Sequence, residues 1–217
     1  IKVVQAVSTL FGFFLPAVGY AFISYRNGWN ALGFGSKIVW KLAGICVLII
    51  LCSGPLIDAL TTLNKAIPIS ANAKAFFDKM ERAYEAQVKV IAEVKTVWQY
   101  LLSLVMIALL PAVFEEVLFR GGMQNLLHRW WKNAWVAIIV TSIIFSAIHG
   151  SWYGFLPRVA LGMLLGAIFY ITQNIWYTIL VHFVNNAAAV TYMYYLTING
   201  KPVSLATETT FPWWAGI

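Results

Sequence analysis

The stretch VWQYLLSLVMIALLPAVFEEVLFRGG, residues 97–122, places two adjacent glutamates and an arginine directly after a long apolar run. The apolar part is close to the ~20 residues that a helix needs to cross about 30 Å of hydrocarbon. Charged side chains at membrane depth are costly unless they are paired, and such side chains are usually functional. The stretch therefore predicts a membrane helix and makes Glu115, Glu116 and Arg120 candidates for a functional role.

The whole chain has the composition of a membrane protein. Of its 217 residues, 61% are hydrophobic and only 11% are charged, and its mean hydropathy is +0.76. An ordinary soluble domain is about half apolar and about a quarter charged. The apolar runs are continuous rather than alternating, which favours helices over a barrel. We therefore expect an all-α fold, a polytopic transmembrane helical bundle with a polar cavity embedded in the membrane.

The apolar runs predict a single membrane domain over residues 1–217 with about six spanning elements. The expected parts are two N-terminal spans (1–60), a loop and an amphipathic helix (61–95), a core that carries the polar residues (96–196) and a tail (197–217). Within the core, helices are expected over about 96–130, 134–149, 156–171 and 175–196.

The segment before the core differs from the apolar runs. Its apolar residues recur at steps of three and four, which predicts one apolar stripe on a helix; they are Phe77, Met80, Tyr84, Val88 and Ile91. Asp78 with Arg82, and Glu85 with Lys89, stand four residues apart on the other side. We interpret this segment as a helix that lies at the membrane surface or covers the bundle, with a solvated polar face.

The formal net charge of +7 does not point to nucleic acid, because no basic run stands out. In a membrane protein, basic residues gather in loops that face anionic cytoplasmic lipid. The basic residues of the 26–37 and 129–134 loops favour a cytoplasmic position for these loops. The 61–95 segment, however, carries six Lys or Arg of its own, offset by four acids, so the orientation stays open. No nucleic-acid partner is expected, and the oligomeric state is not readable from the sequence.

The two glutamates are expected to differ in role. Glu116 and Arg120 are four residues apart on one helical face and can pair directly. Glu115 points about 100° away from that face. This geometry predicts that Glu116 is structural and that Glu115 is the free, reactive carboxylate. Two glutamates at a helix end near water are the simpler alternative.

Two of the three histidines fall in apolar helices of the core. His149 shares a helical face with Phe145, and His182 shares one with Asn186. If residues 128–133 form the turn of an antiparallel helix hairpin, Glu115 and His149 each lie about 21 Å from that turn, at the same depth. His182 is only seven residues beyond Ile175, about 10 Å nearer that turn unless the turn itself is buried.

Three short motifs carry a resemblance to a known family. EEVLFR (115–120), FSAIH (145–149) and HFVNN (182–186) resemble, in order, the EExxxR, FxxxH and HxxxN motifs of the CPBP family, also called the Abi family. Its members include type II CAAX prenyl endopeptidases and bacteriocin-processing proteins. The resemblance extends from about Leu101 to Val190.

The resemblance implies intramembrane proteolysis by a glutamate-dependent route, without a cofactor. Glu115 would be the general base, with His149 helping to activate a water. His182 and Asn186 would stabilise the oxyanion. Glu116, Arg120 and Phe145 would support the site. The implied partners are the lipid bilayer and a membrane-associated peptide or protein substrate, possibly lipidated. The short loops resemble those of bacterial members, so we expect a multi-pass protein of the bacterial plasma (inner) membrane.

Other functions stay open at this point. Glu115, His149 and His182 supply the nitrogen and oxygen ligands of many catalytic zinc sites, although the HExxH motif is absent. Buried charges also suit an ion pathway, but matched broken helices from two inverted halves are not evident. A non-catalytic membrane scaffold, or an immunity or regulatory protein, could retain the motifs for packing.

Arg158 is expected to snorkel to the interface rather than bind substrate.

Overall fold

The computed structural model describes residues 2–92 and 94–201, and within the amphipathic helix it describes side chains up to residue 86. These residues form helices and no strand, as expected for an all-α protein. In chain order the α-helices are α1 (Lys2–Thr9), α2 (Leu15–Ser24), α3 (Gly28–Ala31), α4 (Trp40–Leu51), α5 (Gly54–Ala66), α6 (Ala71–Ala92), α7 (Val97–Ser103), α8 (Leu110–Glu116), α9 (Asn125–Trp131), α10 (Ala134–Ala147), α11 (Phe155–Thr172) and α12 (Ile175–Ile198). Three π-helical segments join some of them, η1 (Leu10–Phe14), η2 (Leu104–Leu109) and η3 (Val117–Gln124).

Three of the described helical stretches are long and apolar enough to cross a membrane, which makes the chain a multi-pass membrane protein. They are Lys2–Ser24, Val97–Trp131 and Phe155–Thr172. The number rises to four if α4 and α5, bent by 40° at their junction, count as one span. The sequence predicted about six. One expected span, α10, has 14 residues and is about 21 Å long, shorter than the hydrocarbon layer.

The π-helical turns explain how two long helices tolerate proline. Pro16 and Pro111 lie in the first turns of α2 and α8, directly after η1 and η2. A proline inside a helix lacks an N–H donor, and its ring clashes with the carbonyl four residues earlier. In both cases that carbonyl belongs to a π-helical turn, whose wider geometry accommodates the ring. The helix that carries Glu115 therefore continues past Pro111.

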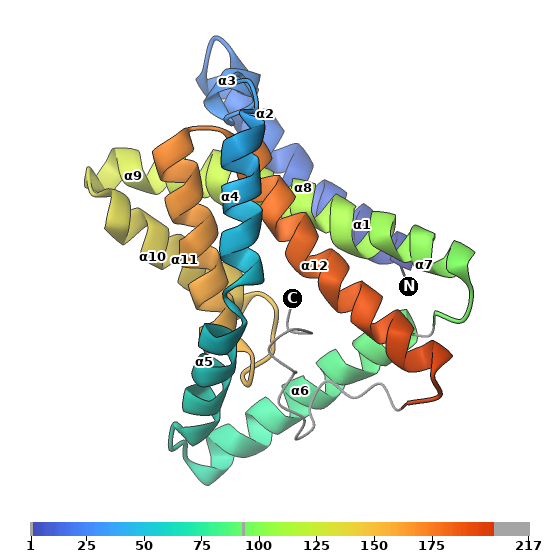
Figure 1. Cartoon of the computed structure of the whole chain (residues 1–217). Helices are drawn as coiled ribbons and strands as arrows, with labels where there is room; N and C mark the ends of the chain where they lie inside the picture. Colours follow the sequence, from blue (N-terminus) through green and yellow to red (C-terminus); the bar gives the residue numbers. More distant parts are fainter. Residues whose placement is uncertain (1, 93, 202–217) are drawn as a thin grey trace.

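The helices α10 and α11 approach each other closely, and α11 binds Arg120 of η3. Figure 1 shows them side by side. A Cβ at Gly162 of α11 would lie 2.9 Å from the Cβ of Ser142 on α10, so glycine permits the contact. The buried carbonyl of Gly162 accepts a hydrogen bond from Arg120 Nη2 at 3.1 Å. One turn further on, Gly166 O accepts from Gln124 Nε2 at 3.0 Å.

The turn between α11 and α12 is buried, so α12 begins deep inside the fold. Asn174 and Ile175 are 1% and 0% exposed. Asn174 Nδ2 donates to the carbonyls of Ser36 and Lys37, and the Ile175 N–H donates to Gly33 O at 3.1 Å. The loop after α3 thus covers the turn. This burial removes the 10 Å mismatch in the depth of His182 that residue counting alone produced.

The amphipathic helix α6 crosses one end of the bundle, between α5 and the start of α7 (Figure 1). Its polar face is not simply solvated, which corrects the expectation from the sequence. Asp78 accepts a hydrogen bond from Tyr153 at 2.7 Å, and it pairs with Lys74 at 2.9 Å in place of the expected Arg82. Val88, Ile91 and the Glu85–Lys89 pair involve side chains outside the described residues, as does the tail from residue 202.

Candidate active site

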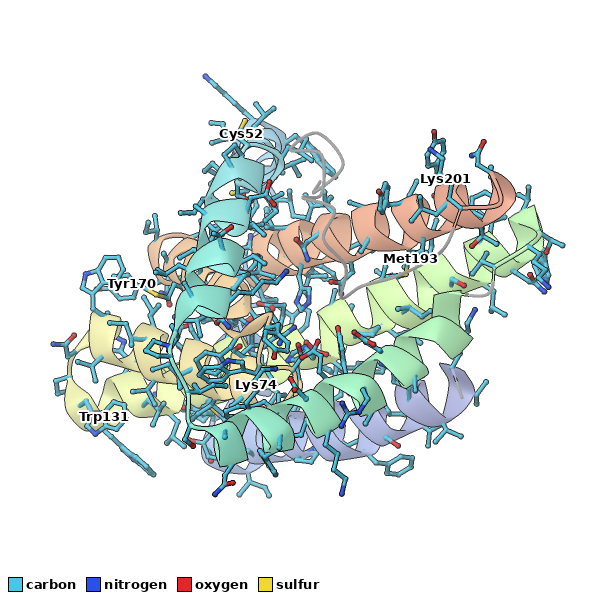
Figure 2. The ribbon with its side chains drawn as sticks, turned by 90° about the horizontal axis from the view of Figure 1, so that it is seen from below. Cys52, Lys74, Trp131, Tyr170, Met193 and Lys201 are labelled. Carbon is cyan, nitrogen blue, oxygen red and sulfur yellow. The ribbon has the colours of Figure 1, made fainter. Side chains whose placement is uncertain are left out.

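A cavity of about 230 Å³ lies among α6, α8, α12 and η2. Glu115, His149, His182 and Asn186, which the sequence singled out, all line it. They come from three places in the chain: α8, the loop after α10, and α12. Much of the remaining wall is apolar and includes Ile107 and Met193; Met193 is labelled on α12 in Figure 2. The structure therefore brings the four candidate residues to one partly apolar cavity.

Glu115 presents a carboxylate that the fold does not neutralise. Its Oε2 lies 3.8 Å from Nε2 of His182, a separation longer than a hydrogen bond. That oxygen is buried without a hydrogen-bond partner among the described residues. A buried acceptor without a partner is uncommon in a stable fold and needs an explanation. The carboxylate is free to bind a water or a substrate in the cavity.

Glu116 is the centre of a buried polar cluster beside the cavity. Its Oε1 accepts from Arg120 Nη1 at 2.9 Å and from His182 Nδ1 at 2.8 Å. Glu116 and Arg120 are both 0% exposed. The pairing with Arg120 has the four-residue spacing that the sequence indicated. The bond to His182 was missed, because no local pattern relates residues 66 positions apart.

Phe145 joins this cluster to the two histidines. The Arg120 guanidinium lies 4.9 Å from its ring centroid, within range of a cation–π contact. The ring also meets His149 and His182 edge to face, at centroid distances of 5.0 and 5.8 Å. Phe145 therefore packs against both imidazoles while it leaves their nitrogens available for polar contacts.

His149 lies in a loop rather than in a helix, which corrects the expected end of α10. The helix ends at Ala147, and Gly150 follows with φ +65°. The His149 Nδ1 hydrogen bonds to the Phe145 carbonyl at 2.7 Å, so Nδ1 is the donor and Nε2 carries the lone pair. Burial, with help from the positive charge of Arg158, lowers the pKa of His149 to about 4. The imidazole is therefore neutral near pH 7.

His182 and Asn186 lie one turn apart on α12 and supply polar groups to the same wall of the cavity. Because His182 Nδ1 is fixed on Glu116, its Nε2 faces Glu115. Asn186 Oδ1 accepts a weak bond of 3.4 Å from Asn185 Nδ2. Its own Nδ2 donates to no other side chain or carbonyl in the described part of the chain. Both residues can therefore direct a nitrogen at a bound group.

Three further features of the site escaped sequence reasoning. Tyr84 of α6 and Ser103 of α7 also line the cavity. Tyr84 belongs to the apolar stripe, and this stripe was the available signal. Arg158 does not snorkel as expected, because its Nη2 donates to the Ser151 carbonyl and its guanidinium lies 5.9 Å from the Tyr84 ring centroid.

The zinc-dependent alternative concerns the spacing of possible metal ligands. In the part of the chain that the structure describes, no three His, Cys, Asp or Glu side chains are gathered as the ligands of one metal ion would be. This holds for Glu115, His149 and His182, the three possible zinc ligands.

One comparison with known proteins gave a match. Residues 97–188 match the family model described as type II CAAX prenyl endopeptidase Rce1-like. The matched segment is less than half of the chain. It contains the four predicted site residues Glu115, His149, His182 and Asn186, and it excludes α1 to α6. No curated protein and no solved structure matches the chain.

Proposed function

We propose that this chain, a member of the Rce1-like family of type II CAAX prenyl endopeptidases by its residues 97–188, is an intramembrane endopeptidase that uses Glu115 to activate water. The observation that carries the proposal is the unneutralised Glu115 carboxylate in a cavity that also holds two imidazoles and an amide. A general base must lie within hydrogen-bond reach of the water that it activates, and a carboxylate that faces a cavity meets that requirement.

In the proposed first step, a water held by Glu115 and His149 attacks the scissile carbonyl carbon. The neutral Nε2 of His149 accepts one hydrogen bond from this water and orients it. The second proton passes to Glu115 as the new C–O bond forms. Glu115 is buried and His149 is partly buried, and this limited contact with bulk water strengthens the electrostatic interactions.

The negative charge that develops on the carbonyl oxygen is met by His182 Nε2–H and Asn186 Nδ2–H. Because His182 Nδ1 already donates to Glu116, this role requires protons on both ring nitrogens. An oxyanion donor of this kind contributes roughly 3–4 kcal/mol to transition-state stabilisation.

The tetrahedral intermediate then collapses. Glu115 returns the proton to the amide nitrogen of the leaving peptide, and the C–N bond breaks. The products are a carboxylic acid and an amine, which become a carboxylate and an ammonium group once the remaining hydroxyl proton passes to the amine. Glu115 is again a carboxylate. No covalent enzyme intermediate is needed, and one water is consumed for each bond cleaved.

The proposed substrate is a membrane-associated peptide or protein segment, with or without an attached lipid. The mixed character of the cavity supports this: the polar residues lie beside an apolar wall that includes Ile107, Val190 and Met193. An extended peptide backbone fits the polar part, and an apolar side chain or lipid fits the wall. The bacterial inner membrane is the proposed location.

Comparison of membrane proteomes tests this function. Cells that lack the protein should accumulate uncleaved substrates, and wild-type protein should reverse the accumulation. The Glu115→Gln form should fail to reverse it while reaching the same level in the membrane. If Glu115→Gln restores the wild-type proteome, a scaffold role replaces the protease. Loss of cleavage after chelation, with recovery on addition of zinc, would favour the zinc-dependent alternative.

A further inference from the structure

The loop between α10 and α11 carries His149 but is held mainly by elements outside the family segment. The backbone N–H of His149 bonds only weakly to Ser146 O, at 3.3 Å, as α10 ends. From Gly150 to Tyr153, the loop contacts α6 and α5, and it also accepts a hydrogen bond from Arg158 of α11. The position of the imidazole therefore depends on these contacts as well as on α10.

Ser151 connects this loop to both α6 and α11. Its hydroxyl donates to Glu81 Oε1 of α6 at 3.0 Å, and its carbonyl accepts from Arg158 of α11. Ser151 is buried and lies two residues after His149. It is therefore fixed from two sides, by an acidic residue on one helix and a basic residue on another.

The two residues that follow Ser151 also hold the loop, against α6 and α5. The Trp152 ring stacks on Phe77, with a centroid distance of 4.4 Å and an interplanar angle of 12°. Tyr153 Oη donates to Asp78 at 2.7 Å. On the side of α5, Asn64 Nδ2 donates to the Trp152 carbonyl at 2.8 Å.

We propose that α6 clamps the His149 loop and that Glu81 and Ser151 are positioning residues for His149. This inference rests on the proposed function. The physical reason is geometric: a shift of about 1 Å in a catalytic group can cost up to about 100-fold in rate. Phe77, Asp78 and Glu81 project from one side of α6 at helical spacing. One helix therefore holds three successive loop residues, 151–153, in position. Since Tyr84 of the same helix lines the cavity, α6 both forms part of the cavity wall and positions His149.

A kinetic comparison of serine variants tests the clamp. Ser151→Ala should lower kcat about tenfold and leave KM within about twofold, because the loop moves while the cavity walls stay. Ser151→Thr retains the hydroxyl and should recover most of the rate. Ser70→Ala is the matched control: the Ser70 hydroxyl accepts from Ala73 N–H at the start of α6, at 3.3 Å, and does not touch the loop. An equal loss in Ser70→Ala would overturn the proposal.

A double-mutant cycle distinguishes positioning from general destabilisation. If Ser151 acts through His149, Ser151→Ala should change the residual rate of His149→Ala by less than about twofold. The same tenfold loss in both backgrounds would contradict the clamp. If Glu115→Gln is fully active, it is the proposed function that fails, and the clamp is then decided by the spectra described next.

Nitrogen-15 spectra of the histidines give a measurement that needs no substrate. The chain contains three histidines, and single substitutions assign their signals. In the wild-type protein, His149 should show one neutral tautomer protonated at Nδ1. Ser151→Ala and Glu81→Ala should each produce a mixture of tautomers at His149. Unchanged His149 signals in both variants would overturn the proposal.

Discussion

His182 Nδ1 and Glu116 Oε1 lie 2.8 Å apart across 66 residues of sequence. This bond fixes the orientation of an imidazole whose other nitrogen faces Glu115. It also makes Glu116 a shared acceptor, because Arg120 binds the same oxygen at 2.9 Å. The two neighbouring glutamates therefore differ sharply: Glu116 is paired twice, and Glu115 stays available for chemistry.

We predict that Glu116→Gln lowers the stability of the protein by about 3–5 kcal/mol, since it leaves a buried arginine without its counterion. Thermal unfolding in detergent measures the effect. The control is Glu115→Gln, which removes a carboxylate whose Oε2 has no hydrogen-bond partner among the described residues. Its unfolding temperature should equal or exceed that of the wild type. Equal destabilisation by the two substitutions would contradict the assignment of roles.

A second prediction concerns the contact between α10 and α11. Gly162→Ala should destabilise the fold by about 1–3 kcal/mol, because the new Cβ would lie 2.9 Å from the Ser142 Cβ. The same change should weaken the bond from Arg120 to the Gly162 carbonyl. Gly44→Ala in α4 is the matched control, since nothing lies within 4 Å of a Cβ there. It should stabilise the helix by about 0.5–1 kcal/mol. Thermal unfolding compares the two.

The third prediction follows from the neutral state of His149. Its pKa falls from 6.5 to about 4 on folding, so the unfolded chain binds a proton more readily than the folded one. The contribution of His149 to stability is fully present above pH 6.5 and is lost as the pH falls towards 4. The unfolding temperature of His149→Gln should therefore depend less on pH over this range than that of the wild type. Parallel pH profiles for the two proteins would contradict the predicted shift.

The sequence predicted the helices and the family well because these depend on local patterns. Continuous apolar runs indicate membrane helices, and a four-residue spacing brings Glu116 to Arg120. The order of three short motifs identified the family before any geometry was available. The pairing of Glu116 with His182, by contrast, depends on how α12 packs against α8, and no local pattern specifies that contact.

The features that escaped prediction all arise from contacts between distant segments. The depth of His182 depends on the carbonyls of Gly33, Ser36 and Lys37, which bury the start of α12. The face of α6 that carries Asp78 and Glu81 has the charges of a solvated surface. It instead binds a loop some 70 residues later in the chain. Hydrogen bonds between distant segments, whether they join side chains or the backbone, leave no periodic signal in the sequence.

Cleavage of one peptide by purified protein in liposomes tests the central claim most directly. The substrate is a peptide from the proteome comparison, and mass spectrometry identifies the bond that is cut. Glu115→Gln should lower kcat by at least about 100-fold while its unfolding temperature matches or exceeds that of the wild type. Cleavage of the same bond by Glu115→Gln at a rate within a few fold of the wild type would contradict the account.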